Sequence, residues 1–456
     1  MKTLAETGRD RQGAIIALLA LGYILLELFP SHSIKTMVSL AIMMIILLVL
    51  PMIRGSLMVI SAVLLTAGIF LMAMYGATWE EWLKASRVNL TLVAIFLFTP
   101  LLGIPVRTGG YVEALKTVMA GKMDNPNFLF AGSSLLSHIL GVVLNIGAIS
   151  IVHELTKASR IENKRMVASS INRGFISTIF WSPYFSAMAL ILSSLPVKWG
   201  DILFYALGLS LIALIISYAF ERPYTVKNVG EEREEPLSEG ERKKAVWKVV
   251  ELFLLLFLMV AVVLVAEKLT TSSMTFIICI LSAMFPLVWC GLKREWGGYK
   301  REFKHHVFVG IPRMKKEIVL FLIAGFFSGA FVKSGWSTFI VEGLNGAFSG
   351  HQIAIAYLIA FAIVTTAVMG LHPIVVVTIV ATSIDPLKLG FSYEFFAILL
   401  LSSWGISNTV SPATAVNNLL SALLKEDLFK VSVHWNLKFA LVMLIIIPIY
   451  LKWVGI

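Results

Sequence analysis

Apolar residues run along this chain in long blocks that are almost free of charge, separated by shorter polar connectors. An uncharged apolar stretch of about 18 residues or more is typical of a helix that crosses a bilayer. We therefore predict an all-α polytopic membrane protein. The blocks lie at residues 13–30, 34–53, 56–76, 91–106, 128–155, 172–195, 202–220, 246–266, 271–291, 318–332, 352–382, 392–424 and 433–453.

The Lys and Arg residues of the connectors predict the topology, because cytoplasmic loops retain basic residues. If every block crosses the membrane, this bias becomes poor after residue 128. If residues 128–155 and 352–382 are instead re-entrant hairpins, eleven spans remain, with the N-terminus in the cytoplasm and the C-terminus outside. Only eight of the 38 basic residues then lie outside, namely Lys35, Lys84, Arg87, Lys198, Lys268, Lys333, Lys388 and Lys452.

The composition agrees with the lipid bilayer as the main surrounding of the chain. Hydrophobic residues make up 58% and charged residues 14%, against about 25% charged residues in a soluble domain. The net charge is +11, but the basic residues form no stripe, so we expect no nucleic-acid binding. Cys279 and Cys290 have no partners at metal-ligand spacing and are expected to be small buried hydrophobes. No small-residue cleavage site accompanies the apolar run from Gly13, so a retained first span is expected.

Three matches at an offset of about 226–229 residues indicate an internal repeat. The paired segments are 93–115 with 319–341, 143–152 with 370–380, and 180–192 with 409–420. Each unit then holds a span, a surface helix, a hairpin, a broken span and a further span. Because one hairpin opens to the cytoplasm and the other to the outside, the units are inverted, as in many secondary transporters.

The repeat predicts how the chain is divided. Scaffold spans and loops flank the two units, and a charged linker with Gly and Pro lies near the midpoint. The predicted parts are N-terminal scaffold spans 1–90, repeat 1 at 91–220 with its hairpin 128–155 and broken helix 172–195, a cytoplasmic linker 221–245, two scaffold spans with a basic cytoplasmic loop 246–317, and repeat 2 at 318–456 with its hairpin 352–382 and broken helix 392–424.

Two stretches place helix-breaking and polar residues inside apolar blocks, at 172–186 and 402–418. A proline there frees backbone carbonyls, and the N-terminus of a half-helix presents N–H groups and a positive dipole end. Carbonyl and hydroxyl oxygens suit Na⁺, whereas N–H groups suit a carboxylate or another oxyanion. Alternatively, these residues only kink ordinary transmembrane helices. The candidate substrate- or ion-binding residues are Ser137, His138, Asn145, Ser182, Pro183, His372, Ser407, Asn408, Thr409, Ser411, Pro412, Thr414 and Asn417, with Na⁺ at Ser407, Asn408 and Thr409.

Histidine and basic residues inside or beside the blocks have two interpretations each. His138 and His372 could shuttle protons or donate to an anion, or could be packing histidines with satisfied hydrogen bonds. Arg107, Arg173 and Lys333 could attract an anion, although basic residues at helix ends also extend their charge toward water. No other metal site or cofactor is predicted, because no second soft ligand lies at helical spacing.

Missing motifs exclude other kinds of protein. No Asp lies within the predicted hairpins or broken spans, and Glu27 and Glu154 lie near span ends, which argues against a carboxylate-based cation–proton antiporter. The chain has no GxxxxGK[ST] motif, so we expect no ATP-driven transport. It has neither HExxH nor GxSxG, so we expect no enzyme of the intramembrane protease or esterase type.

At the paired stretches the chain resembles the ion transporter superfamily, which includes divalent-anion/sodium symporters and citrate and C4-dicarboxylate carriers. The resemblance lies in a span that leads to Lys333-Ser334-Gly335, in its partner Arg107-Thr108-Gly109, and in the Ser407-Asn408-Thr409 triplet, which matches a signature of sodium-coupled carboxylate members. It implies a transport domain, made of a hairpin and a broken helix, that moves as an elevator against a scaffold. It also implies a scaffold that can form a homodimer.

The sequence thus favours a secondary active transporter of the cytoplasmic membrane that moves a small anion, such as a carboxylate, and is coupled to Na⁺ or H⁺. Two alternatives stay open. One is a membrane-embedded enzyme or polymer-handling protein, such as a glycan ligase or polymerase. The other is a membrane assembly subunit without coupled transport.

Overall fold

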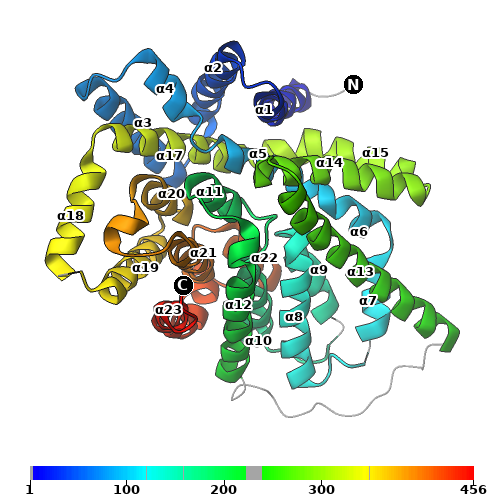
Figure 1. Ribbon diagram of the computed structural model, residues 1–456. Coiled ribbons are helices and arrows are strands. Elements are labelled where there is room, and N and C mark those ends of the chain that lie inside the picture. Colours follow the sequence, from blue (N-terminus) through cyan, green and yellow to red (C-terminus); the bar gives the residue numbers. More distant parts are fainter. Residues whose placement is uncertain (1–3, 120, 158, 222–238, 349) are drawn as a thin grey trace.

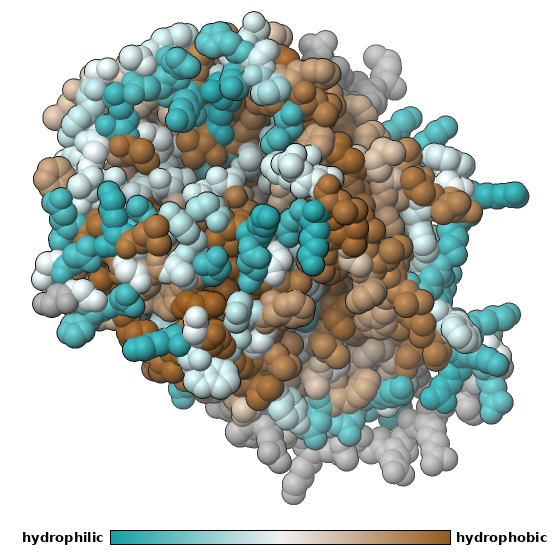
Figure 2. Space-filling model, in the orientation of Figure 1, coloured by the Kyte–Doolittle hydropathy of each residue, from teal (hydrophilic) through white to brown (hydrophobic). Residues whose placement is uncertain are grey.

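The structure is a computed structural model that describes residues 4–119, 121–157, 159–221, 239–348 and 350–456. These residues form helices and no strands (Figure 1), which confirms the predicted all-α polytopic membrane protein. Within this part of the chain, nine helices are long and apolar enough to cross a membrane, and a tenth is added if one bent helix pair counts as a span. Figure 2 shows a broad hydrophobic strip between regions richer in hydrophilic residues, as a lipid-facing surface requires.

The N-terminal part consists of helices α1 to α4, of which α2, α3 and α4 pack against α17 of the C-terminal half. Helix α4 begins with a capping box, in which Thr78 and Glu81 satisfy each other's backbone N–H groups. The bounds are α1 Leu4–Leu28, α2 His32–Val49, η1 Leu50–Met52, α3 Ser56–Met74 and α4 Trp79–Ser86.

The two predicted units follow the same order of elements. The first runs through α5 Leu90–Phe98, η2 Thr99–Gly103, α6 Ile104–Thr108, α7 Tyr111–Met119, α8 Pro126–Leu144, α9 Gly147–Thr156, α10 Lys164–Ile179, α11 Ser186–Ser194 and α12 Trp199–Glu221. The second runs through α17 Lys315–Lys333, α18 Trp336–Phe348, α19 Gln352–Val368, α20 Pro373–Ser383, η5 Pro386–Leu389, α21 Tyr393–Val410, α22 Ala415–Leu424, η6 Lys430–His434 and α23 Trp435–Trp453. Their inversion relative to a membrane stays a prediction.

Helices between the units differ in part from the predicted connectors. Residues 222–238 of the predicted linker lie outside the described residues, and residues 239–245 already belong to α13. The basic loop 292–317 is largely helical, because it contains few residues that stop a helix once Gly298 is passed. The bounds are α13 Glu239–Leu269, α14 Met274–Leu292, α15 Trp296–His305, η4 His306–Gly310 and α16 Ile311–Arg313.

The helices that could cross a membrane are not the same set as the eleven predicted spans. The block 172–195 is divided into α10 and α11, each of which is short, and α17 is bent by 75° against α18. By contrast, α8 of the first predicted hairpin has 19 residues and is long and apolar enough to cross a membrane. Of the helices that could cross a membrane, the broken helix α21–α22 is the most enclosed. In its apolar segment 94% of the residues are buried, against 17% in α3. It therefore forms the centre of the bundle.

Four helix breaks have local causes. Pro412 disfavours helical backbone at the residue before it, so Ser411 is extended (φ −80°, ψ 125°) and α21 ends at Val410. Pro373 has the same effect on His372 (φ −65°, ψ 127°), which begins α20. Between α8 and α9, Asn145 takes a positive φ of 50°, which asparagine tolerates better than most residues. Pro183 lies in the break between α10 and α11.

Both predicted hairpins bring their ends together. At the base of the first, Ser159 Oγ donates to the Met123 carbonyl at 2.7 Å, and the Arg160 backbone N–H donates to Asp124 Oδ1 at 2.9 Å. At the base of the second, Gln352 Nε2 donates to the Gly390 carbonyl at 2.7 Å. In addition, α9 has 10 residues, or about 15 Å, which is half the thickness of a hydrocarbon core. This geometry supports a chain that enters and leaves on one face.

A labelling experiment tests the first hairpin in the membrane. Single cysteines at Asn125 and Lys157, both exposed, are expected to react with an impermeant thiol reagent from the same side, because the hairpin ends are hydrogen-bonded together. A background with Cys279 and Cys290 changed to alanine removes the native thiols. A cysteine at Lys198, which the charge pattern puts outside, marks the opposite side. Reaction of positions 125 and 157 from opposite sides would contradict the hairpin.

Candidate functional site

All four helix breaks meet at one pocket. Its lining includes the turn residues Asn145 and Ile146 from the first hairpin and His372 from the second. The broken helices contribute residues 185–187 and 413–416. The pocket holds about 100 Å³ of enclosed space, beyond which it is open on one side. Pockets for drug-sized ligands measure about 300–1,000 Å³, so this pocket suits only a small solute. Since the two hairpins and the two broken helices belong to different predicted units, the pocket lies between the units.

Four short helices point their N-termini at this pocket. Helices α9, α11, α20 and α22 have 9 to 11 residues each, and each begins at a pocket-lining segment. The first N–H groups of a helix have no partner within the helix. Side-chain caps are absent from α9, α11 and α22, whereas His372 Nδ1 accepts from the Ile374 N–H in α20. The pocket therefore combines free N–H donors with the positive ends of several helix dipoles.

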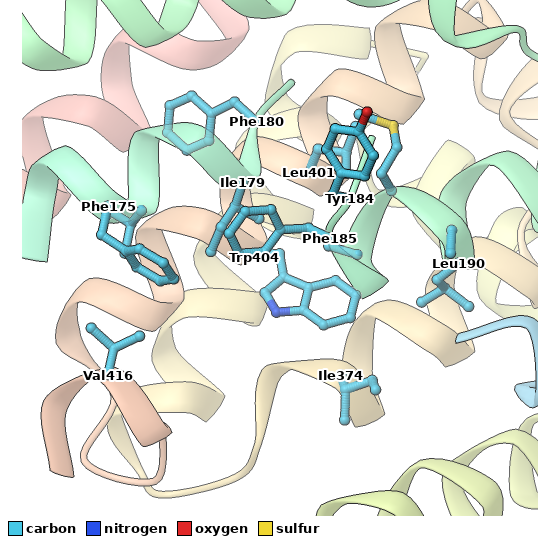
Figure 3. Close-up of a cluster of buried hydrophobic side chains, with 14 of the residues drawn as sticks. Phe175, Ile179, Phe180, Tyr184, Phe185, Leu190, Ile374, Leu401, Trp404 and Val416 are labelled. Carbon is cyan, nitrogen blue, oxygen red and sulfur yellow. The ribbon is translucent and has the colours of Figure 1, made fainter. Parts of the chain in front are cut away.

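Aromatic side chains form much of the pocket wall. Phe175 and Phe185 lie with ring centroids 5.6 Å apart, and Phe321 lies 5.3 Å from Phe96 and 5.8 Å from the His372 ring. Trp404 of α21 also lines the pocket and is buried. Figure 3 shows the Trp404 indole near Phe185, in a cluster that includes side chains from both units. These rings exclude water, which strengthens polar interactions inside the pocket.

Asn417 holds the break between α21 and α22 in shape. Its Nδ2 lies 2.8 to 3.1 Å from the carbonyl oxygens of Asn408, Thr409 and Ser411. Its Oδ1 accepts from Asn172 Nδ2 of α10 at 2.7 Å. All of these groups are buried, so the amide satisfies carbonyls that the break would otherwise leave without partners. The Asn172–Asn417 contact also joins the two broken helices directly.

The predicted site residues divide into two sets. Asn145, His372, Asn408 and Thr414 line the pocket. The others do not belong to its lining, although several support the breaks behind it. Those residues are Ser137, His138, Ser182, Pro183, Ser407, Thr409, Ser411, Pro412 and Asn417.

The last turn of α21 contains Ser407, Asn408 and Thr409. These three residues are therefore helical, and the helix breaks after them. Ser407 Oγ and Asn408 Nδ2 both donate to the Trp404 carbonyl, at 2.6 and 3.1 Å. Thr409 Oγ1 donates to the Gly405 carbonyl at 3.4 Å. Of the three predicted Na⁺ ligands, only Asn408 reaches the pocket. The described residues contain no group of three or more His, Cys, Asp or Glu side chains that could hold a metal ion.

His138 is buried behind the pocket with both ring nitrogens hydrogen-bonded. Trp181 Nε1 donates to its Nε2 at 3.2 Å, which assigns the proton to Nδ1, and Nδ1 lies 2.8 Å from Ser177 Oγ. Neither nitrogen is left for a solute. The arrangement is that of a packing histidine that joins α8, α10 and the first break.

The basic residues that could have attracted an anion do not line the pocket. Arg107 pairs with Glu302 and Lys333 with Glu81, both at 2.7 Å near the surface. The prediction that Arg173 extends its charge toward water from a helix end is wrong, because Arg173 is only 2% exposed. Its Nη2 lies 3.0 Å from Glu221 Oε1, and its Nε donates to Asn436 Oδ1 at 2.9 Å.

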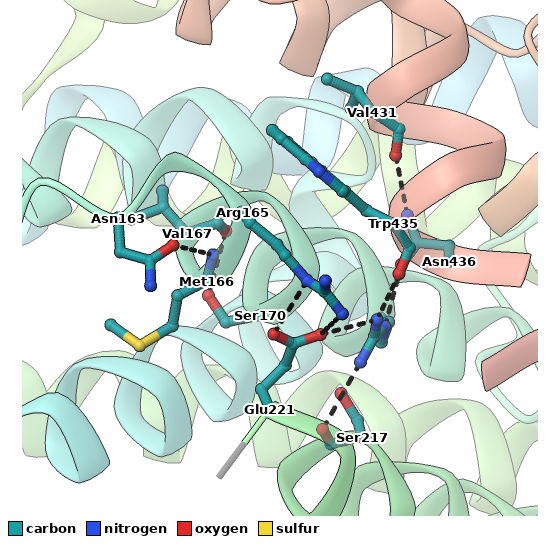
Figure 4. Close-up of polar contacts among 11 residues, drawn as sticks. Asn163, Arg165, Met166, Val167, Ser170, Ser217, Glu221, Val431, Trp435 and Asn436 are labelled. Atoms are coloured by element: carbon teal, nitrogen blue, oxygen red, sulfur yellow. Dashed lines mark hydrogen bonds and ion pairs between the residues drawn. The ribbon is translucent and has the colours of Figure 1, made fainter. Parts of the chain in front are cut away.

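This cluster connects three helices of the bundle (Figure 4). Arg173 belongs to α10, Glu221 to the end of α12 and Asn436 to α23. Glu221 is 1% exposed and also pairs with Arg165 at 3.3 Å. The Arg173 guanidinium further lies 4.9 Å from the Phe439 ring centroid. Glu221 is the buried counter-ion of Arg173, while the Arg165 side chain is 29% exposed. The cluster is therefore a structural clamp between the first unit and the last helix of the second.

Three residues of the site were missed from the sequence. Glu317, which directly precedes the apolar block 318–332, lines the pocket. Trp404 and Asn172 lie inside the two polar stretches 402–418 and 172–186. Nothing in the neighbouring sequence distinguishes them as residues of a site.

Fold and helix lengths together define a polytopic helical membrane protein with two broken-helix units around a central pocket. Comparison with protein-family models gives no match, and comparison with curated protein sequences gives none either. Among solved structures, the chain is similar in fold to MtrF of Neisseria gonorrhoeae, described as representing a class of antimetabolite efflux pumps, with a TM-score of 0.54, 12% identity, and coverage of 86% of this chain and 94% of MtrF. The YdaH transporter of Alcanivorax borkumensis gives a TM-score of 0.49 and 14% identity over 80% of this chain and 85% of YdaH.

Proposed function

We propose that this protein is a secondary active transporter that carries a small anion, a carboxylate, across the cytoplasmic membrane, driven by a gradient of Na⁺ or H⁺. One observation carries the proposal: four half-helix N-termini converge on a pocket whose lining residues include neither Lys nor Arg. Such N-termini bind anions through N–H groups and helix dipoles. Broken helices that meet between two repeats are how many secondary transporters build their substrate sites.

Specific groups are assigned to the anion. The N–H groups of Ser186 and Ala187 in α11 and of Ala415 and Val416 in α22 would donate to the carboxylate oxygens, since these residues line the pocket at the first turns of their helices. Asn408 would add a donor, because only one of its two Nδ2 hydrogens is needed for the Trp404 carbonyl. The aromatic wall would contact the apolar part of the solute.

An elevator is the proposed mechanism of alternating access. The hairpins and broken helices would move together with α5 and α17, which also line the pocket, while α1 to α4, α13 and α14 would remain as the scaffold. The fold similarity to MtrF supports transport in general, and membership of the ion transporter superfamily remains a hypothesis. We also propose a homodimer through the scaffold, as that resemblance implies.

The rim of the pocket includes the first turns of two helices. Glu317 and Leu57 line it from the first turns of α17 and α3. Arg54, Lys315 and Lys316 adjoin these turns, and the charge pattern places them in the cytoplasm. We therefore infer that the structure represents an inward-facing state.

Transport by reconstituted protein tests the proposal. Proteoliposomes are supplied with radiolabelled succinate, citrate or benzoate under an inward gradient of Na⁺ or H⁺, and gradient-dependent uptake of at least one anion is expected. Asn408→Ala is expected to lower that uptake about tenfold, because one hydrogen bond to a charged group is worth about 1.5–3 kcal/mol.

Ser403→Ala is the matched control. Ser403 belongs to the same helix and is buried, but its hydroxyl has no hydrogen-bond partner and does not line the pocket. Uptake by this variant should equal that of the wild type. If well-folded wild-type protein neither takes up nor exchanges any of the three anions, the proposal of a carboxylate carrier is wrong. Equal uptake by the Asn408→Ala variant would remove Asn408 from the site.

A further inference from the structure

Glu317 places a carboxyl group in the pocket. It is the third residue of α17, and its Oε2 atom is shielded from solvent without a hydrogen-bond partner in the structure. Its neighbours in the pocket lining include Leu57, Leu320 and Phe321. An unpaired carboxylate among apolar side chains is costly, so the group either binds a cation or takes up a proton.

The same pocket carries the helix N-termini assigned to the anionic solute. If Glu317 were ionised, it would repel a bound carboxylate, and like charges about 4 Å apart cost several kcal/mol at the effective dielectric of a protein. Protonation of Glu317 removes this repulsion. Binding of the proton and binding of the anion then favour each other, and thermodynamic linkage makes the effect reciprocal.

We propose that Glu317 binds the coupling proton, so that one proton and one anion move together. This inference rests on the proposed function and names the driving ion. A hydronium ion that reaches the open side of the pocket gives its proton to Oε2, where an O–H bond forms and a water molecule remains. On the other side of the membrane, or after the anion leaves, the proton returns to water.

A proton fits this position better than Na⁺ does. Na⁺ needs several oxygen ligands at once, and of the three oxygen-bearing side chains expected to bind it only Asn408 lines the pocket. A proton needs only one oxygen atom that accepts no other hydrogen bond, and Glu317 Oε2 has no hydrogen-bond partner in the structure.

The ionisable groups around Glu317 are few. On its own helix, Lys316 acts on it electrostatically, and Lys315 precedes it. From α20, His372 lines the same pocket. Helices α3 and α5 contribute no ionisable side chain, and Arg313 of α16 is exposed. The ionisable residues of the other helices packed on α17 lie toward its C-terminal end, where Lys333 pairs with Glu81. Those residues are His32, Lys35, Glu80, Lys84 and Glu342.

Glu317→Gln tests the inference, since glutamine has the shape of the protonated carboxyl group and cannot ionise. Proteoliposomes are assayed with radiolabelled succinate, citrate and benzoate in two modes: accumulation driven by an inward pH gradient, and exchange of labelled for unlabelled anion without a gradient. We expect the variant to lose accumulation, with the ratio of inside to outside concentration falling to one, while exchange persists. In the wild type, affinity should fall about tenfold per pH unit once Glu317 ionises, and in the variant it should not change.

Glu394→Gln is the matched control, because Glu394 also lies in the first turn of a long helix, α21, but does not line the pocket. This variant should accumulate anions as the wild type does. If the wild type transports but only a Na⁺ gradient drives it, or if Glu317→Gln still accumulates anions in response to pH, the inference is wrong and the carrier function stands. If the wild type shows neither uptake nor exchange, the carrier function itself fails.

Discussion

Replacement of Glu221 by Met is expected to destabilise the protein by about 3–5 kcal/mol, because it leaves the Arg173 guanidinium buried without its counter-ion. Arg173 is 2% exposed and Glu221 is 1% exposed, so water cannot replace the lost partner. The double change Arg173→Met with Glu221→Met should recover most of the loss, since an apolar pair of similar volume needs no counter-ion. The free energy of unfolding of each variant is measured on purified protein in detergent, with unfolding induced by heat or by denaturant.

The Arg107–Glu302 pair provides the comparison. Its side chains are 39% and 23% exposed, and exposed ion pairs contribute about 0–1 kcal/mol. Glu302→Met should therefore cost much less than Glu221→Met. A double variant at positions 173 and 221 that is as unstable as the sum of its single variants would show that the two charges do not act as a pair.

Introduction of an acid at the start of α22 is expected to abolish anion binding without harm to the fold. Ala415 is the first residue of α22, is exposed, and lines the pocket. Aspartate at the first turn of a helix is favourable by about 0.3–1 kcal/mol, so Ala415→Asp should be at least as stable as the wild type. Its charge would repel a carboxylate solute, and affinity should fall roughly 100-fold.

Ala415→Asn separates charge from size, because asparagine has nearly the same shape as aspartate and is neutral. We expect it to bind the transported anion within a fewfold of the wild type, as measured by exchange in proteoliposomes. If Ala415→Asp transports normally, the N-terminus of α22 does not contact the solute. If both variants fail equally, the pocket is blocked by bulk and the electrostatic argument loses its support.

Both predictions follow from how charge is distributed in the interior. The buried Arg173 is paired with Glu221 and lies away from the pocket, while the pocket relies on helix ends for its positive potential. A potential built from backbone N–H groups needs no counter-ion and does not change with pH. That leaves Glu317 as the carboxyl group of the pocket through which pH could act.

Much of the fold was available from the sequence, because its causes are local. The length of the apolar blocks determined a membrane protein of helices, since only a helix satisfies its own backbone in lipid. Pro412 determined where α21 ends and Pro373 determined where α20 begins, because the residue before proline avoids helical backbone. The break between α21 and α22 lies at 411–414, inside the stretch 402–418 that the sequence singled out.

The site itself was decided by the tertiary structure. No local pattern distinguishes Asn145, which lines the pocket, from His138, which packs behind it seven residues earlier. Glu317 precedes an apolar block and has no local signal of a site, and its place in the pocket depends on hairpins and broken helices far from it in the sequence. Arg173 looked like a residue at a helix end, but Glu221 and Asn436 from two other helices hold it inside. Sequence thus determined the elements and their breaks, through backbone hydrogen bonding and apolar length. Only packing decided which side chains share a pocket, because their neighbours come from segments that no local rule connects.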